Sequence, residues 1–437
     1  MHILIIGNGI AGVTAALTIR KLSGFQITIV SGENPHFYAR TALMYLYLGQ
    51  MRYADIKPYE DWFWHENNIS LKHDWVNAIN FRQKTALLAS GEKISYDKLL
   101  LATGSKTNFQ NWPGQHLKGV HGFYHLQDLQ NIETATKNCT AAVIVGGGLV
   151  GVELAEMLHA SNIKVTMLVR DNHYWGKNLP PQEAKLIENR LAENGIEIRL
   201  KTTLKHLESD ENGNVGAAIT DQDERILCSF AGIATGVIPN TDLAKTFGIE
   251  TNKGILVNPF LETSQPDVFA AGDCAELSFA NARIEQLWYT GRMQGEIAAH
   301  NICGKKIPYE RGIPYNSAKF FDLELQTYGN VVPDSDQNEN SFYWQNEAGN
   351  ASLRLNYVND EVKSITGFIA LGIRLRQEVC EKWIGEKRPL MYVLQHLKEA
   401  NFDPEFQRRN ENDILLAFKT QNPEIELTAL KKKLRWL

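Results

Sequence analysis

The sequence predicts an α/β fold in which one parallel-sheet module occurs twice and is followed by a smaller α+β domain. The first observation is a buried strand, a glycine-rich turn, a helix and a second strand, which follow one another over residues 2–30 and again over 142–169. The second is the tripeptide Ala-Thr-Gly, which occurs once downstream of each copy. These features predict an internal repeat, and a change to alternating segments after about residue 312 marks the third part.

The first copy begins with the apolar strand 2–7, and helical spacing over 12–22 and a strand at 26–30 complete a βαβ unit. Residues 75–101 are expected to form β-hairpins, with Ser90-Gly91 at one turn, and to end in the apolar strand 98–101.

The second copy repeats this order and continues into further elements. We expect strands at 142–145, 164–169 and 196–200, helices at 150–160 and 181–194, and a hairpin turn at 212–214. In the third part we expect strands at 341–344, 352–357 and 362–369 and helices at 371–386 and 390–400. The predicted domains are therefore a discontinuous first domain, 1–112 with 243–312, a second domain, 113–242, and a C-terminal domain, 313–437.

Composition and charge exclude several functional classes. The 437 residues carry a formal net charge of -5, which argues against nucleic acid as the main partner. The five cysteines are scattered without a close pair, as in a reducing compartment, and the histidines show no metal-like grouping, so no metal site is expected. No targeting segment and no membrane-spanning run is apparent, so we expect a cytoplasmic protein without a transmembrane segment.

The first motif is a glycine-rich hexapeptide between a strand and a helix, Gly7-Asn8-Gly9-Ile10-Ala11-Gly12. Gly7 permits the tight turn, Gly9 lets the backbone approach a pyrophosphate, and Gly12 allows close helix–strand packing. The helix N-terminus then attracts phosphate groups. Glu33, about twenty residues on, is placed to accept hydrogen bonds from ribose hydroxyls. This context predicts a Rossmann-like dinucleotide site.

The second motif has the same pattern, Gly146-Gly147-Gly148-Leu149-Val150-Gly151, with Glu153 two residues later. Here the next strand ends in Arg170 instead of an acidic residue. An arginine suits the 2′-phosphate of NADPH, whereas an acid would hold the 2′-hydroxyl of NADH. NADPH is therefore favoured modestly, and NADH stays open.

A third motif, residues 263–273, is a strand that ends in Gly272-Asp273. With both glycine motifs and both Ala-Thr-Gly segments, it resembles the FAD-dependent pyridine nucleotide-disulfide oxidoreductase superfamily over roughly the first 310 residues. The resemblance implies a glutathione-reductase-like fold with FAD in the first module, NAD(P)H in the second, and a C-terminal interface domain.

The same resemblance assigns further residues to the two cofactors. Gly272 and Asp273 are expected at the FAD ribityl chain, and Gln286, Leu287 and Trp288 along the flavin ring. The Ala-Thr-Gly segments are expected to line the two sites through Ala102, Thr103, Gly104 and Gly236.

The branch of the superfamily depends on what lies beside the flavin. Arg40 stands where a single reactive cysteine occurs in other members, so a thiol relay is not expected. The pattern Tyr38-x-Arg40-x-x-Leu43 resembles ferredoxin and rubredoxin reductases and the flavin module of assimilatory nitrite reductases, which implies that Arg40 holds the FAD phosphates or ring. Glu153 is expected to orient the nicotinamide, although Tyr45 replaces the lysine with which ferredoxin reductases often pair it. Cys274 is expected to be a packing residue.

The favoured function is an FAD-dependent NAD(P)H oxidoreductase that moves hydride from nicotinamide to flavin and then passes electrons to a ferredoxin- or rubredoxin-like acceptor. One alternative is a peripheral membrane quinone reductase, because residues 413–437 are amphipathic with a basic end. Another is a redox-sensing flavoprotein resembling apoptosis-inducing factor. The acceptor and a homodimeric state are left open by the sequence.

Overall fold

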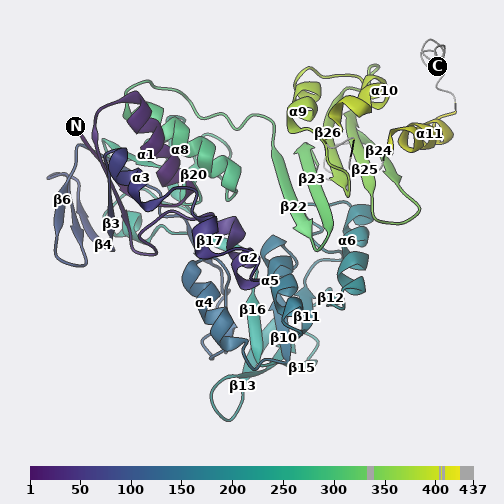
Figure 1. Ribbon diagram of the computed structural model, residues 1–437, viewed down its shortest axis with the longest axis horizontal. Coiled ribbons are helices and arrows are strands. Elements are labelled where there is room, and N and C mark those ends of the chain that lie inside the picture. The colour runs from purple at the N-terminus through teal and green to yellow at the C-terminus, as the bar shows by residue number, and fades with distance from the viewer. Residues whose placement is uncertain (332–338, 403–404, 406–408, 424–437) are drawn as a thin grey trace. The chain divides into compact units, whose positions relative to one another are not determined.

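The computed structural model describes residues 1–331, 339–402, 405 and 409–423. The first glycine motif follows the middle strand of a five-stranded parallel sheet (Figure 1). The strand order is β19 (Val268–Ala270), β7 (Lys98–Leu101), β1 (His2–Ile6), β2 (Gln26–Ser31) and β3 (Ile69–His73). The middle residues of β1 are fully buried, as expected for a parallel strand that is covered on both faces.

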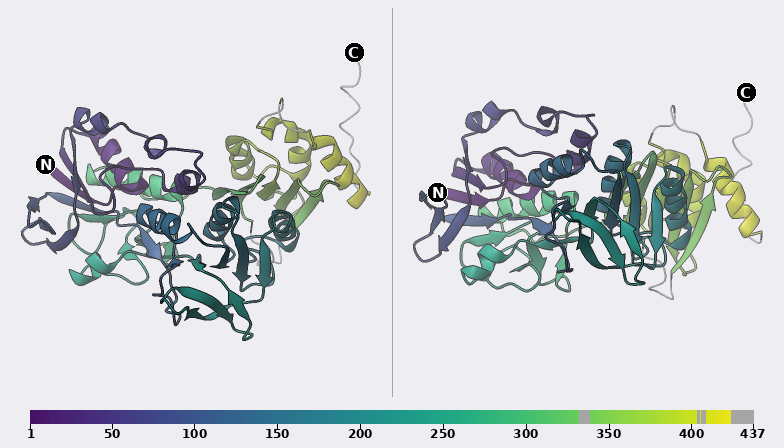
Figure 2. Two further views of the ribbon diagram at one scale, coloured as in Figure 1. Left: turned by 60° about the horizontal axis from the view of Figure 1, so that its bottom comes forward. Right: turned by 90° about the horizontal axis from the view of Figure 1, so that it is seen from below.

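Helices α1 (Ile10–Leu22) and α8 (Trp288–Ile302) lie side by side on this sheet (Figures 1 and 2). Their approach is close because Gly295 has no side chain: a β-carbon there would lie 2.3 Å from the carbonyl oxygen of Ala11. The expected hairpins form a separate antiparallel sheet of β4 (Val76–Asn80), β5 (Thr85–Leu88) and β6 (Lys93–Ser95).

The second copy is built in the same way around β10 (Ala141–Val145). Parallel strands β11 (Lys164–Val169) and β16 (Phe230–Ile233) flank it, and β9 (Val120–His121) follows β16. Helix α5 (Leu149–Ala160) follows the glycine turn, and α4 (Leu126–Ala135) follows β9. The expected turn at 212–214 joins the antiparallel strands β13 (Leu204–Ser209) and β14 (Val215–Thr220), which pair with β15 (Arg225–Leu227).

Both glycine turns are held by the same backbone contact. Gly7 has φ +108°, and a β-carbon on it would lie 2.1 Å from the carbonyl oxygen of Ala102. Gly146 has φ +123°, and its β-carbon would lie 2.2 Å from the carbonyl oxygen of Ala234. Each Ala-Thr-Gly segment therefore presses an alanine carbonyl against the first glycine of its own module, which explains why the two motifs occur together.

The threonines of these segments join the two modules. β8 (Ser105–Thr107) and β17 (Val237–Pro239), which follow the two segments, pair as antiparallel strands. The hydroxyl of Thr103 donates to the carbonyl oxygen of Asn240, and that of Thr235 donates to the carbonyl oxygen of Asn108, both at 2.7 Å. The threonine of each Ala-Thr-Gly segment thus binds the backbone just after the β-strand that follows the other segment.

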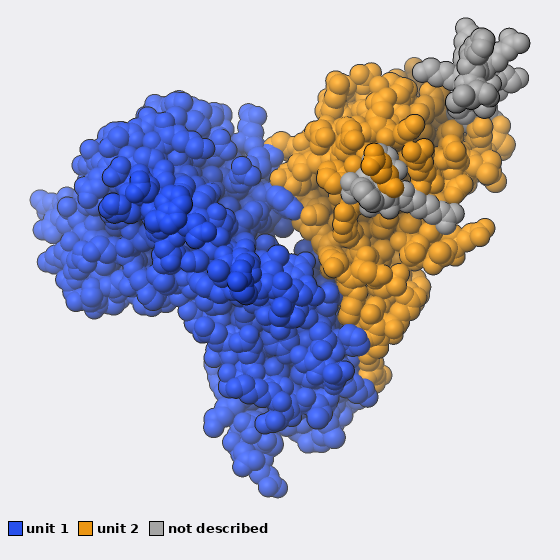
Figure 3. Space-filling model, in the orientation of Figure 1, with its two compact units in different colours: residues 1–168, 202–311 blue, residues 169–201, 312–437 orange. Residues whose placement is uncertain are grey.

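The chain divides into two compact units (Figure 3). Unit 1 is residues 1–168 with 202–311, and unit 2 is residues 169–201 with 312–437. This division keeps both glycine motifs in unit 1. The three-domain division expected from the sequence stays a prediction.

Unit 2 contains an antiparallel sheet in the order β22 (Tyr315–Phe320), β23 (Leu323–Gly329), β26 (Ile365–Leu371), β25 (Ser352–Val358) and β24 (Glu339–Gln345). It also holds helices α6 (Pro181–Glu193), α9 (Gln377–Gly385), α10 (Leu390–Ala400) and α11 (Glu411–Gln421) and strand β12 (Glu197–Leu200). The guanidinium of Arg354 on β25 forms a buried ion pair with Glu183 on α6, with Nε 2.7 Å from Oε1.

Two of the expected boundaries in unit 2 are wrong. The strand expected at 362–369 runs from Ile365 to Leu371, because its last residues pair with β23 and β25. Gly372 then turns the chain with φ +62°, and helix α9 begins at Gln377, not at residue 371. Pairing with neighbouring strands outweighs the local helical spacing here.

Two further sequence expectations concern cysteines and membranes. All five cysteines lie in the described residues as free thiols. Within the same residues, no helix combines the length and the apolar character that crossing a lipid bilayer requires. Residues 424–437, which contain the basic end, lie outside the described residues.

Gly7→Ala should destabilise the protein strongly. The new β-carbon would meet the Ala102 carbonyl, and the left-handed φ disfavours alanine, so a loss of about 3 kcal/mol in the free energy of unfolding is expected. Chemical denaturation measures this loss. Gly24→Ala is the control, because no atom lies within 4 Å of its β-carbon position. Equal stability of the two variants would contradict the turn geometry.

Candidate functional site

In each turn the third glycine is tightly packed, whereas the second has free space beside its α-carbon. A β-carbon on Gly12 would lie 2.0 Å from the carbonyl oxygen of Gly7, and one on Gly151 would lie 2.3 Å from that of Gly146. A β-carbon on Gly9 or Gly148, in contrast, would have no neighbour within 4 Å. The backbone is therefore accessible above Gly9 and Gly148, where the sequence predicts pyrophosphate contacts.

The helices that follow are suited to phosphate groups. α1 begins at Ile10 and Ala11, and α5 begins at Leu149 and Val150. Neither N-terminus has a capping side chain, and neither first turn contains an acidic residue. The backbone N–H groups and the positive end of each helix dipole can thus interact with an anion. Both turns fit a dinucleotide.

The carboxylate of Glu33 lies in a cluster of charged and aromatic side chains beyond the end of β2. Its Oε2 lies 2.7 Å from Nη2 of Arg40 and 3.2 Å from Nδ1 of His125. Its Oε1 accepts hydrogen bonds from Nη1 of Arg40 at 3.1 Å and from the hydroxyl of Tyr38. Burial raises the pKa of Glu33, but the hydrogen bond with His125 and the charge of Arg40 outweigh it and hold the pKa well below its usual range.

Arg40 is not a surface arginine. Its guanidinium lies over the ring of Tyr124, 4.5 Å from the ring centroid, and donates to the carbonyl oxygen of that residue. The guanidinium is thus held in a fixed orientation beside the residue expected to bind the ribose.

Tyr124 links this cluster to Asp273. Its hydroxyl donates to Oδ2 of Asp273 at 3.0 Å and accepts from the backbone N–H of Ser105 at 3.1 Å. Burial raises the pKa of Asp273, while Tyr124 and Arg40 act in the opposite direction. Gly272, with φ +80°, turns the chain from β19 so that Asp273 lies in this position.

Sequence reasoning missed Tyr124 and His125. Both precede α4, where the carboxylate of Asp128 accepts from their backbone N–H groups at 2.8 Å each. An acidic residue three positions after the N-cap residue is a capping signal, so the sequence could have located this helix N-terminus. Nothing local in the sequence indicates that the segment meets Glu33, Arg40 and Asp273.

The segment expected along the flavin ring also lies in unit 1. Nε2 of Gln286 donates to the hydroxyl of Ser105 at 2.9 Å, and Leu287 precedes α8 as its N-cap residue. Trp288 begins α8 and stacks on Phe37 with ring centroids 5.9 Å apart. Gly104 has φ +67°, and its β-carbon would lie 3.2 Å from the hydroxyl of Tyr124. The described contacts therefore bring Gly104, Ser105, Tyr124 and Gln286 together.

In the second module, Glu153 lies on α5 two residues after Gly151. Burial, together with the nearby charge of Glu156, raises the pKa of Glu153 to about 7. Gly236 has φ +95° and no atom within 4 Å of its β-carbon position. Both residues remain candidates for the nicotinamide nucleotide.

Arg170 directly follows β11, and 66% of its side chain is exposed. Its Nε lies 3.4 Å from Oδ1 of Asp171, a residue that sequence reasoning missed. The strand is thus followed by a cation and an anion in turn, and an acidic group at a strand end is the feature that the NADH alternative requires.

Cys274 is a packing residue. Its side chain is fully buried, and its thiol donates to the carbonyl oxygens of Leu101 and Ala271. Burial raises the pKa of this thiol, which makes the reactive thiolate unfavourable. In the described part of the chain, no three potential ligand side chains are grouped as a metal site would require.

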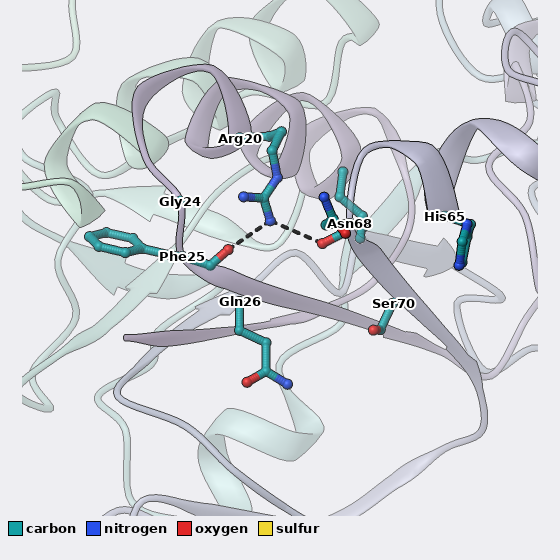
Figure 4. Close-up of a pocket in the computed structure, with 8 residues that line it drawn as sticks. Arg20, Gly24, Phe25, Gln26, His65, Asn68 and Ser70 are labelled. Atoms are coloured by element: carbon teal, nitrogen blue, oxygen red, sulfur yellow. Dashed lines mark hydrogen bonds between the residues drawn. The ribbon is translucent and has the colours of Figure 1, made fainter.

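A separate pocket lies at the opposite ends of the strands (Figure 4). Gln26 at the start of β2 and Ser70 near the start of β3 line it, and Nη2 of Arg20 donates to the carbonyl oxygens of Phe25 and Asn68 there. Nucleotides bind beyond the carboxyl ends of parallel strands, so this pocket is not the dinucleotide site.

Comparison with known proteins places these features in a family. The model for the pyridine nucleotide-disulphide oxidoreductases matches residues 1–295. A rubredoxin-NAD(+) reductase of Pseudomonas putida is 28% identical over 316 residues, covering 70% of this chain and 81% of the relative. An assimilatory nitrate reductase electron transfer subunit of Bacillus subtilis is 28% identical over 376 residues, covering 84% of this chain. The match spans only 47% of that relative, and 41% of a nitrite reductase [NAD(P)H] from the same organism.

Solved structures share the fold. A ferredoxin reductase from Rhodopseudomonas palustris is 23% identical with a TM-score of 0.78, and the match covers 85% of this chain and 91% of that one. An NADH:rubredoxin oxidoreductase from Clostridium acetobutylicum is 24% identical with a TM-score of 0.69, with 94% and 98% covered. The predicted two-module α/β fold is thereby confirmed, and the relatives include the classes that the Tyr38-to-Leu43 pattern indicated.

Replacing Glu153 should make stability less dependent on pH. A raised pKa in the folded protein stabilises it at low pH, and this stabilisation is lost as the pH rises through about 7. Glu153→Gln stays neutral, so its free energy of unfolding relative to wild type should rise by on the order of 2 to 3 kcal/mol between pH 4 and pH 8.5.

Urea denaturation across this pH range, without added nucleotide, measures the difference. Glu60→Gln, a change at an exposed glutamate of the same unit, is the control. A stability difference for Glu153→Gln that is constant with pH would refute the raised pKa.

Proposed function

This chain belongs to the pyridine nucleotide-disulphide oxidoreductase family, and we propose that it is an FAD-dependent reductase that takes electrons from NADPH or NADH and passes them to a separate acceptor protein. The observation that carries the proposal is the duplicated open glycine turn, at Gly9 and at Gly148, within one unit of a single chain. Two such turns in one unit fit an enzyme that moves electrons between two nucleotides.

We assign FAD to the first module. When bound, FAD accepts two electrons from a nicotinamide and releases them singly. Glu33 would accept hydrogen bonds from the adenosine ribose, and its low pKa keeps the carboxylate ionised for this role. Asp273 would accept from the ribityl chain, in place of the hydroxyl of Tyr124 that it binds here. Trp288 and Phe37 would exclude water from the ring.

We assign the nicotinamide nucleotide to the second module. Glu153, with a pKa of about 7, is partly protonated at neutral pH and can both donate to and accept from a carboxamide. Tyr45, where a lysine would ionise this glutamate more fully, is consistent with such a half-protonated state. Glu153 would then orient the nicotinamide without a permanent charge.

The acceptor is proposed to be an iron–sulfur protein of the ferredoxin or rubredoxin class. The resemblance places Arg40 where other members carry a reactive cysteine, and Cys274 is buried, so neither position offers a thiol to pass electrons to a disulfide. The relatives of this chain include a rubredoxin-NAD(+) reductase and an assimilatory nitrate reductase electron transfer subunit, which supports this choice. A homodimer and a cytoplasmic location are proposed as well, and size-exclusion chromatography and cell fractionation test them.

The quinone reductase alternative has less support. It requires an apolar helix face near the C-terminus for contact with the membrane. On α11, Ile414 and Phe418 are instead buried in the core of unit 2, although Leu416 is exposed. The part of this segment that the structure describes therefore favours packing.

Anaerobic stopped-flow mixing of the purified protein with NADPH and with NADH tests the function. We expect the flavin absorbance to bleach within the first seconds and to return when oxidised ferredoxin or rubredoxin is added. An FAD-containing protein that neither nucleotide bleaches would contradict the proposal. Bleaching that only a quinone reverses would favour the membrane alternative.

The same experiment tests Arg170. If its guanidinium binds the 2′-phosphate, Arg170→Ala should lower the second-order rate constant for NADPH roughly tenfold and leave that for NADH within about twofold. Lys253→Ala, which removes an exposed cation elsewhere, is the control. An equal loss with both nucleotides would exclude this role.

A further inference from the structure

Glu285 is a buried carboxylate that the proposed mechanism does not use. Only 3% of the residue is exposed, and it lies three positions before α8. Its Oε2 accepts hydrogen bonds from the hydroxyl of Tyr309 at 2.6 Å and from Nε2 of Gln294 at 3.3 Å. A buried charge costs stability unless it is well paired, so this arrangement calls for a reason.

Two arginines compensate the charge. Oε1 of Glu285 lies 2.9 Å from Nε of Arg283 and 3.6 Å from Nη1 of Arg311. Oε1 accepts no hydrogen bond within the described residues, so both contacts are ionic. Two guanidinium groups thus face this carboxylate, and an ionised carboxylate can only accept hydrogen bonds.

This restriction sets the orientation of Gln294. Its amide group is fully buried and has one donor end and one acceptor end. The donor end must face Glu285, so the carbonyl end faces the other way. There, Oε1 of Gln294 accepts from the backbone N–H of Gly272 at 2.8 Å.

Gly272 is the turn that presents Asp273. With φ +80° it has a left-handed backbone, and a β-carbon would lie 2.9 Å from that of Ala11 on α1. The Gly272 N–H is therefore a buried donor in a tightly packed turn, and its only described side-chain partner is Gln294.

We propose that Glu285 is a positioning residue for the flavin site. It fixes the amide of Gln294, which fixes the Gly272 turn, and the turn holds the Asp273 carboxylate at the ribityl chain. The same carboxylate binds Tyr309 and Arg311, the last residues of unit 1, so it links the end of this unit to the cofactor turn. This inference rests on the proposed binding of FAD in the first module.

Glu285→Gln tests the idea with almost no change in shape. The new amide must direct its NH₂ group either toward two arginines or toward two donors, Tyr309 and Gln294. The charges of the two arginines disfavour the first arrangement. In the second, the NH₂ group faces the donor end of Gln294, so Gln294 must rotate and the Gly272 N–H is left without its partner. Glu276→Gln is the matched control, because Glu276 is fully buried in the same unit and accepts from Asn252 and Gly254 at 2.9 and 2.7 Å, away from the turn.

The measurements are the dissociation constant of FAD, the visible circular dichroism of the bound flavin, and the melting temperature of the FAD-free protein. We expect Glu285→Gln to weaken FAD binding roughly tenfold and to change the flavin dichroism, while Glu276→Gln stays within about twofold of wild type. FAD affinity and dichroism that match those of Glu276→Gln would overturn the proposal.

Tyr309→Phe removes one hydrogen bond from Glu285 and serves if Glu285→Gln does not fold. A loss of about threefold in FAD affinity is expected, and unchanged affinity would overturn the proposal. A wild-type protein that binds no FAD at all would instead refute the proposed function. The two failures are therefore distinguishable.

Discussion

The carbonyl oxygens of Ala102 and Ala234 stand where a side chain on residue 7 or 146 would have to begin. Ala102 follows β7 and touches the turn after the neighbouring strand β1, and Ala234 follows β16 and touches the turn after β10. The helix after each turn therefore begins directly beyond the ends of these strands. The same tripeptides continue into β8 and β17, whose pairing joins the two modules. The shape of the turn, the position of the helix N-terminus and the junction between the modules therefore all depend on the close contact between a glycine and an alanine carbonyl. Only glycine permits this contact.

The three carboxylates near these turns have different pKa shifts because their surroundings differ. Glu33 is kept ionised by a hydrogen bond with His125 and by Arg40. Partial burial raises the pKa of Asp273, and the hydrogen bond from Tyr124 opposes this shift. Desolvation and the nearby charge of Glu156 raise the pKa of Glu153 to about 7. Nearby cations and donors thus separate a permanently charged ribose acceptor from a carboxyl group that can change its protonation at neutral pH.

The features that the sequence predicted are those encoded within a few residues or in the repeat. The glycine turns, both βαβ units and the hairpin at 212–214 follow from local spacing. Tyr124 could not be assigned because it meets Arg40 across 84 residues and Asp273 across 149. Gln294 on α8 meets the turn after β19 across 22 residues, a contact that no local pattern reports. The start of α9 was misplaced for a related reason, since strand pairing decided where β26 ends.

Two similar turns are proposed to hold two different nucleotides, FAD over Gly9 and a nicotinamide dinucleotide over Gly148. Calorimetric titration of Gly9→Ala and Gly148→Ala with FAD and with NADP⁺ or NAD⁺ tests this proposal most directly, because both β-carbons would point into open space and leave the fold intact. We expect Gly9→Ala to lose FAD affinity alone and Gly148→Ala to lose nicotinamide nucleotide affinity alone. Reversed losses, or no loss in either variant, would contradict it.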